Sequence, residues 1–112
     1  GVCLGHQAIA ESFGAKLENL SDVFHGVSAE IIQPVNSPLF AGLKHPIIVG
    51  RYHSWAVSKD DFPDCLEIIA ETSDGIIMAL RHRDYNLYGI QFHPESVLTP
   101  QGNRILHNWL VL

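Results

Sequence analysis

The spacing of hydrophobic residues divides the chain into one short helix and a series of strands in its first two thirds. Ile9 and Phe13 lie on one helical face, and Gly14 follows at a position where helices commonly end. This spacing predicts a helix over residues 6–13 that begins just after Cys3. Segments rich in Val, Ile, Leu and aromatic residues, broken by Asn, Ser, Pro and Asp, predict strands near 15–18, 23–33, 47–57 and 66–72.

Turn signals mark several further points along the chain. Asp74-Gly75 separates two apolar runs, 67–73 and 76–80, and this dipeptide between such runs is a strong signal for a hairpin. The two runs are therefore predicted as antiparallel neighbours. Residues 87–93 predict a further strand that places His93 at its end, and residues 37–43 predict a single helical turn with proline at its first position.

The last segment has the pattern of an amphipathic helix. Thr99 and Pro100 fit an N-cap followed by proline at the first helical position. Apolar residues then recur at helical spacing at Ile105, Leu106, Trp109 and Leu110. We therefore expect a helix that begins at Thr99-Pro100 and closes the domain.

Composition limits the possible functions. With 112 residues, 46% of them hydrophobic, the chain can form one compact domain or a piece of one. The net charge is −5 and the seven Lys and Arg are scattered, which argues against nucleic acid and membrane surfaces as partners. Cys3 and Cys65 form no Cys-x-x-Cys pair, so we expect neither a disulfide framework nor a metal site, and a reducing, cytoplasmic setting.

Reactive chemistry is indicated at both ends of the chain. Gly-x-Cys-x-Gly before a helix has the form of a nucleophile elbow, in which the glycines permit a tight turn and leave the sulfur of Cys3 exposed. The helix amides favour a thiolate there, and the backbone N–H of Leu4 is placed to hold an oxyanion. The alternative is a buried structural cysteine, which is the commoner role of this residue.

A second constellation lies in the sequence Phe-His-Pro-Glu. Residues two apart on an extended strand project to the same side, so Glu95 can orient the imidazole of His93. Histidine is the side chain that titrates near neutral pH, which suits it to take a thiol proton and return it to a leaving amine. Together, Cys3, His93 and Glu95 form a candidate catalytic triad.

Three motifs in order now resemble a known family. GVCLGHQ at residues 1–7, RYHSW at 51–55 and GIQFHPES at 89–96 resemble the class I (triad) glutamine amidotransferases over essentially the whole chain. Within that class, His25-Gly26, Arg81-His82-Arg83 and the residues after Glu95 look most like the glutaminase subunits of anthranilate synthase and aminodeoxychorismate synthase.

The resemblance implies a role for each matching residue. Cys3 would form a glutamyl thioester with L-glutamine, without a cofactor, while Gln7, Ser54 and Trp55 would bind the substrate. Trp55 departs from the leucine of the family pattern, and it is equally consistent with aromatic packing beneath a strand. The partner would be a chorismate-using component I subunit of anthranilate synthase or, alternatively, of aminodeoxychorismate synthase.

The resemblance also implies the architecture. We expect an α/β fold with a mainly parallel sheet flanked by helices and an antiparallel hairpin near Asp74-Gly75. Because the chain opens at Gly1 directly in the elbow, we interpret residues 1–112 as the C-terminal part of one glutamine amidotransferase domain. An earlier glycine-rich loop of the family would then be absent, and we expect little glutaminase activity from this chain alone.

Two other functions are compatible with the same residues. The chain could be a folded interaction module with a catalytically incomplete triad. It could also be a cysteine hydrolase of the same architecture acting on γ-glutamyl peptides, which would need no synthase partner. Preferential reaction of Cys3 with a glutamine-like electrophile separates the first of these from an enzyme, and co-purification with a chorismate-using subunit separates the second.

Overall fold

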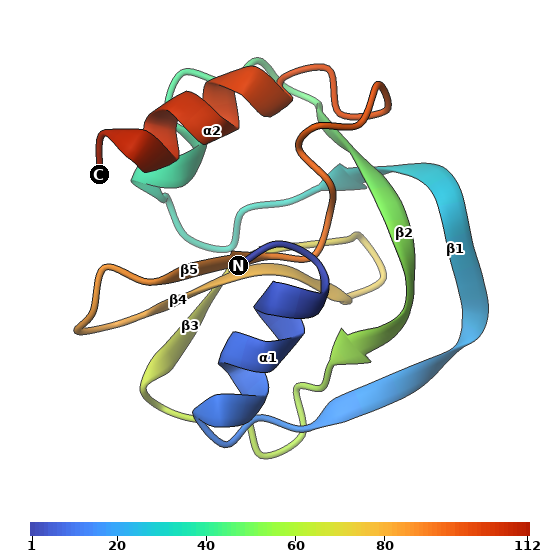
Figure 1. The fold of residues 1–112 in the computed structure, drawn as a ribbon, viewed down its shortest axis with the longest axis vertical. Coiled ribbons are helices and arrows are strands. Elements are labelled where there is room, and N and C mark those ends of the chain that lie inside the picture. The colour runs from blue at the N-terminus through green and yellow to red at the C-terminus, as the bar shows by residue number, and fades with distance from the viewer.

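Two antiparallel sheets and two helices make up the fold. The computed structural model describes residues 1–112, and Figure 1 shows the arrangement. The elements in chain order are α1 (Leu4–Ser12), β1 (Leu17–Ile31), the 3-10 turn η1 (Pro38–Phe40), β2 (Ile47–Val57), β3 (Leu66–Glu71), β4 (Ile77–His82), β5 (Tyr88–Ile90) and α2 (Gly102–Leu110). None of the helices is both long and apolar enough to cross a membrane.

The three-stranded sheet has the order β3-β4-β5 and contains the predicted hairpin. Strands β3 and β4 are antiparallel, with Leu66 opposite His82 and Glu71 opposite Ile77. The turn at Asp74-Gly75 joins them, as its sequence predicts. Strand β5 is shorter than predicted: it ends at Ile90, and the chain then leaves the sheet three residues before His93.

The second sheet is a long ribbon of β1 and β2, seen along one side of the molecule in Figure 1. Pairing runs from Leu17 opposite Val57 to Ile31 opposite Ile47, with a register shift between Asn19 and Phe24. The strands predicted near 15–18 and 23–33 are therefore one continuous strand. The polar residues between them interrupt the ladder as an irregularity without ending the strand, because pairing with β2 resumes on both sides.

The α/β class is confirmed, but the strand ladders in this chain are antiparallel. Parallel pairing is limited to one bridge between Val2 and Ile90, which brings the beginning of the chain beside β5 (Figure 1). The physical reason is the connections: parallel neighbours need a crossover, whereas short turns join β3 to β4 and β4 to β5. The predicted mainly parallel sheet is thus represented here by that single contact.

The helices match the prediction at one end of the chain and differ at the other. Helix α1 begins at Leu4, directly after Cys3, as expected. Helix α2 begins at Gly102 with Gln101 as its N-cap, so the predicted start at Thr99-Pro100 is wrong. The Thr99 hydroxyl is bound instead to the main chain of Gly50 and His93, which are distant in the sequence.

The apolar core is divided into two clusters. The larger one joins α2 and η1 to both sheets, and its members are Ile31, Leu39, Phe40, Ile47, Val49, Ile69, Ala70, Met78, Ala79, Ile90, Phe92 and Ile105. The smaller one lies between α1 and the β3–β4 hairpin and consists of Ala10, Ala15, Val57, Leu66, Ile77 and Leu80. Each helix therefore covers its own part of the core.

Candidate active site

Cys3 occupies a strained turn between an extended segment and a helix. Its backbone has φ 54° and ψ −105°, a conformation that residues with a side chain rarely adopt. The Cys3 N–H donates to the Ile90 carbonyl over 2.7 Å, and α1 begins at the next residue. A Cβ on Gly1 would lie 2.6 Å from the carbonyl carbon of Gly5, so the elbow requires glycine at position 1. This is the predicted geometry of a nucleophile elbow.

The thiol of Cys3 is half-buried and has two polar neighbours. The sulfur lies 3.9 Å from the Tyr52 carbonyl, to which it donates, and 3.7 Å from Nε2 of Gln91, from which it accepts. Burial raises the pKa of Cys3 above its ordinary value, whereas hydrogen bonds from the Leu4 N–H and from Gln91 lower it. The Leu4 amide therefore favours the thiolate as predicted, but burial outweighs it, so a base is needed to remove the proton at neutral pH.

His93 and Glu95 form a hydrogen-bonded pair in the loop after β5. Nδ1 of His93 lies 3.1 Å and 3.2 Å from the two carboxylate oxygens of Glu95. The main chain of His93 is fixed on both sides, because its N–H donates to the Gly50 carbonyl over 3.1 Å and its carbonyl accepts from the Thr99 hydroxyl over 2.6 Å. The carboxylate thus occupies Nδ1 and leaves Nε2 available as a base.

Tyr52 connects the thiol to the imidazole. Its carbonyl accepts from the Cys3 thiol, and its ring packs edge-on against the His93 ring with centroids 5.1 Å apart. The charge of Glu95 also acts on Cys3, where it raises the pKa of the thiol. Cys3 and His93 are therefore on the same side of the molecule. No direct hydrogen bond joins their side chains, and contacts of this kind often shorten only when the substrate binds.

The residues predicted to bind glutamine converge on one open pocket. The pocket has a volume of about 170 Å³ and is lined by Cys3, Leu4, Gln7, Tyr52, His53, Ser54 and Trp55. The residues predicted as nucleophile, oxyanion donor and glutamine-binding groups thus line one cavity: Cys3, Leu4, Gln7, Ser54 and Trp55. Tyr52 and His53 also form its wall.

Gln7, which is predicted to bind the substrate, has its side-chain nitrogen engaged within the protein. Its side chain is buried, and Nε2 donates both to the Trp55 carbonyl over 2.9 Å and to Oε1 of Gln91 over 3.1 Å. Both amide hydrogens are therefore engaged within the protein. Gln7 lines the pocket and ties α1 to its far wall, and only its carbonyl oxygen has no partner within the protein.

The carbonyl of Trp55 is held by two donors. Besides Gln7, Nδ1 of His53 lies 2.9 Å from it, while Nε2 of His53 accepts from Nε of Arg51 over 3.1 Å. Because a carbonyl only accepts and an arginine only donates, His53 is neutral with its proton on Nδ1. Burial accordingly lowers the pKa of His53. Trp55 as a whole residue is 47% exposed and lines the pocket.

Sequence reasoning did not single out Gln91 and His53. Gln91 is fully buried beside the sulfur of Cys3. The sequence did contain a signal for this position, because a residue two positions before His93 projects to the same side of an extended chain. His53 alternates with the buried Arg51 along β2, a pattern that by itself does not distinguish a core histidine from a pocket residue.

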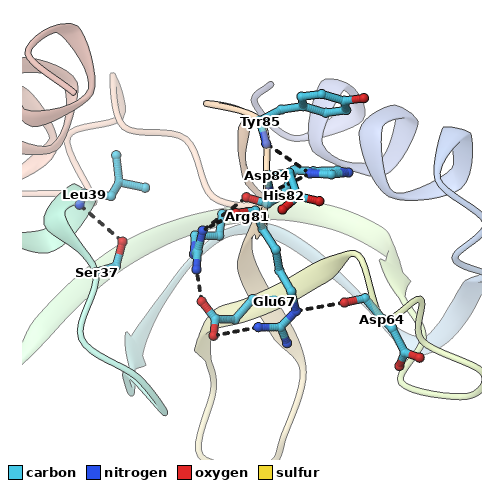
Figure 2. A network of polar contacts seen from close by, with 9 residues as sticks. Ser37, Leu39, Asp64, Glu67, Arg81, His82, Asp84 and Tyr85 are labelled. Atoms are coloured by element: carbon cyan, nitrogen blue, oxygen red, sulfur yellow. Dashed lines mark hydrogen bonds and ion pairs between the residues drawn. The ribbon is translucent and has the colours of Figure 1, made fainter.

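The motif Arg81-His82-Arg83 has a structural role (Figure 2). Arg81 and Arg83 contact the two carboxylate oxygens of Glu67 at 2.7 Å and 3.2 Å, and Arg81 holds the pKa of that carboxyl below its usual range. Nδ1 of His82 accepts from the main-chain N–H groups of Asp84 and Tyr85. None of these residues lines the Cys3 pocket, and no group of three or more His, Cys, Asp or Glu side chains in the chain is placed to hold a metal ion.

The elbow, the pocket and the fold together define a class of protein. The family model for glutamine amidotransferase class-I matches residues 1–112, so the chain belongs to the class I glutamine amidotransferase family. In overall structure it is similar to a protein of Thermoplasma acidophilum that is provisionally named as part of a GMP synthase. The TM-score is 0.87 at 27% identity, over 99% of this chain and 54% of that one.

The chain is also similar in sequence to individual members of the family. The chain is 47% identical over 117 residues to anthranilate synthase component 2 of Cyanidium caldarium, covering 100% of this chain and 60% of the relative. It is 44% identical over 110 residues to aminodeoxychorismate synthase component 2 of Escherichia coli K12, covering 98% of this chain and 58% of the relative. The chain therefore spans little more than half the length of these relatives.

Proposed function

We propose that this chain carries the glutaminase site of a chorismate-using synthase, most simply anthranilate synthase, with Cys3 as nucleophile, His93 as base and Glu95 as the residue that orients His93. The observation that carries the proposal is the pocket beside Cys3, because Gln7, Ser54 and Trp55, the three residues expected to bind glutamine, all line it. The relatives named above support the partner class, since both names denote the second component of such a synthase.

The proposed reaction is a double displacement at the carboxamide of glutamine. The Cys3 sulfur attacks the amide carbon while Nε2 of His93 takes the thiol proton. The carbon–nitrogen bond then breaks, His93 returns the proton to the nitrogen, and ammonia leaves a γ-glutamyl thioester on the sulfur. Water next gives a proton to His93 and attacks the thioester carbon, which releases glutamate and restores the thiol.

The raised pKa of Cys3 supports a base-assisted attack. A thiol that stays protonated at neutral pH needs proton removal during the reaction, which general base catalysis supplies with a gain of roughly a hundredfold or more. The negative charge that develops on the substrate oxygen would be held by the Leu4 N–H at the start of α1. Ser54 and Trp55, which line the pocket, would contact the rest of the glutamine molecule, largely through their main-chain groups.

The proposal is tested by labelling with a diazoketone analogue of glutamine. We expect Cys3 to be alkylated well before Cys65, with glutamine protecting Cys3, as read by peptide-resolved mass spectrometry. The variant His93→Asn should slow labelling about a hundredfold, whereas His45→Asn, which changes an exposed histidine, serves as the control. Equal labelling of the two cysteines, or no difference between the two variants, would contradict the proposal.

The two pathways are separated by the partner. Anthranilate synthase supplies tryptophan synthesis, and aminodeoxychorismate synthase supplies folate synthesis; both names occur among the relatives. The chain should be mixed with each component I subunit from its own genome, with chorismate and glutamine present, and the aromatic product identified. Binding to component I without glutamine-dependent product and without labelling of Cys3 would favour the alternative function, a catalytically incomplete interaction fragment.

A further inference from the structure

Gln91 is the buried side chain that lies against the sulfur of Cys3. It follows β5, is fully buried, and its main-chain N–H donates to the Met78 carbonyl over 2.8 Å. Its amide bridges two residues, because Nε2 lies 3.7 Å from the Cys3 sulfur and Oε1 accepts from Gln7 over 3.1 Å. A polar side chain in such a position has its hydrogen-bonding groups fixed by the protein rather than by water.

The orientation of the Gln91 amide follows from the groups around it. The Trp55 carbonyl can only accept, so the contact of 2.9 Å from Gln7 must involve the nitrogen of Gln7. The second hydrogen on that nitrogen then points to Gln91, which must present its oxygen. The nitrogen of Gln91 is consequently directed at the sulfur of Cys3. The oxygen and nitrogen of a side-chain amide can be interchanged when they are assigned, but a main-chain carbonyl cannot. The Trp55 carbonyl therefore fixes the orientation of both glutamine amides.

We propose that Gln91 is the side-chain donor that stabilises the Cys3 thiolate, held in register by the chain of hydrogen bonds from the Trp55 carbonyl through Gln7. This inference rests on the proposed function, in which Cys3 is the nucleophile. The neutral thiol donates a hydrogen bond to the Tyr52 carbonyl. Once that proton is removed, the contact with Tyr52 becomes repulsive, while the hydrogen bond from Gln91 becomes charge-assisted and stronger.

The charges around the pocket increase the need for such a donor. No lysine or arginine lines the pocket, and α1 carries no acidic residue in its first turn and no basic residue in its last. The titratable groups that face the thiol are Tyr52 and His53 on the pocket wall, with His93 and Glu95 in the loop beyond Tyr52. The carboxylate of Glu95 acts against a thiolate. Because no lysine or arginine lines the pocket, neutral donors must help the protonated His93 to stabilise the sulfur anion.

The test is the pH profile of alkylation of Cys3 by iodoacetamide. The reagent is small and neutral and needs neither glutamine binding nor a partner, so the result is independent of the glutaminase assay. Gln91→Met keeps the approximate shape of the side chain but removes the donor, and it should slow Cys3 at pH 7 about ten- to hundredfold and move the profile to higher pH. Cys65 in the same molecule is the internal reference. Gln101→Met is the control variant, because it removes a hydrogen-bonded glutamine that does not line the pocket.

A second variant separates the donor from a purely structural role. Gln91→Glu in its ionised form keeps an oxygen for Gln7 but cannot donate to the sulfur, so it should slow Cys3 at least as much as Gln91→Met. Unfolding would expose both thiols and accelerate both, so slow Cys3 with unchanged Cys65 cannot arise from lost structure. A wild-type profile in either folded variant would overturn the proposal. If Gln91→Met is unfolded, the profile of Gln91→Glu decides.

Discussion

Tyr52 shows how one residue can serve the site through three different groups. Its carbonyl accepts from the Cys3 thiol, its ring packs against His93, and its hydroxyl lies 2.8 Å from the Ser96 hydroxyl. The ring therefore limits where the imidazole can turn, and the hydroxyl ties β2 to the loop that carries the His93–Glu95 pair. A side chain without the hydroxyl would keep the packing and lose only that tie.

His6 is the most deeply buried titratable side chain near the elbow. It is fully buried, and neither ring nitrogen makes a hydrogen bond of full geometry, although the nearby Gly89 main chain opposes part of the effect of burial on its pKa. Burial lowers the pKa of His6 from its ordinary 6.5 to about 4. The folded chain thus binds a proton at His6 less readily than the unfolded chain does.

The pKa of His6 predicts a pH dependence of stability. Above pH 6.5 the histidine is neutral in both states, and its contribution is fully present. As the pH falls from 6.5 towards 4, only the unfolded state takes up the proton, so the free energy of unfolding should decrease by up to about 1.4 kcal/mol per pH unit.

Urea denaturation between pH 4 and 7 measures this dependence. His6→Met should have a shallower slope than the wild-type chain, with the exposed His45→Met as the control for loss of a histidine. His53, whose pKa is lowered in the same direction, remains in all three proteins and cancels in the comparison. The same slope in His6→Met and the wild type would show that His6 is not buried as a neutral group.

At the scale of elements, the loop from residue 93 to 99 is attached to β2. The Gly50 N–H donates to the Thr99 hydroxyl, and the Gly50 carbonyl accepts from the His93 N–H. A Cβ on Gly50 would lie 2.9 Å from the Cβ of Leu98 and 3.0 Å from the Ser96 hydroxyl, so glycine is needed for this close approach. The position of His93 in the loop therefore depends on Gly50 in strand β2.

Replacing Thr99 with valine tests this attachment. The variant keeps the shape of the side chain but leaves the buried Gly50 N–H without its acceptor, which should cost about 1–3 kcal/mol of stability. We also expect slower labelling of Cys3 by the glutamine analogue, because the His93 carbonyl loses its donor. Thr99→Ser retains the hydroxyl and should behave nearly as wild type in both measurements. Equal stability of the two variants would contradict the proposed attachment.

Local sequence signals located most elements but not their long-range contacts. The elbow at Cys3, helix α1 and the hairpin at Asp74-Gly75 depend on neighbouring residues, and the structure has them where the sequence predicts them. Thr99 has the local signature of a helix N-cap, yet its hydroxyl bonds to the main chain of Gly50 and His93. These two residues compete with the helix N-terminus for the hydroxyl, and a local sequence pattern cannot show such a long-range competitor. For the same reason the orientation of Gln7 could not be foreseen, since it is set by Trp55 and Gln91.

At the scale of the whole molecule, the two sheets differ in how well they are covered. Only Ile31 in β1 is buried, whereas β4 is buried at five of its six positions. A two-stranded ribbon with one exposed strand has little apolar contact to hold it closed. Strand β2 is buried at seven of its eleven positions, so the weakly covered element is β1. The stability of the molecule is therefore concentrated in β2, the β3-β4-β5 sheet and the helices.

Amide hydrogen exchange should reveal this difference. We expect residues 18–28 of β1 to exchange by local opening well before residues 78–80 of β4, which should exchange only with global unfolding. Exchange followed by NMR at rising urea concentration distinguishes the two, because local opening is insensitive to low denaturant. Equal protection of β1 and β4 would mean that the ribbon and the central sheet open as one unit.

The elbow and the imidazole are both secured through main-chain atoms: Cys3 binds the Ile90 carbonyl, and His93 binds the Gly50 carbonyl. Peptide groups are the same in every residue, so most surrounding side chains can be substituted without moving Cys3 or His93. A common scaffold can then tolerate extensive change in its sequence. Gly1 and Gly50 are exceptions, because a side chain at either position would collide with neighbouring atoms.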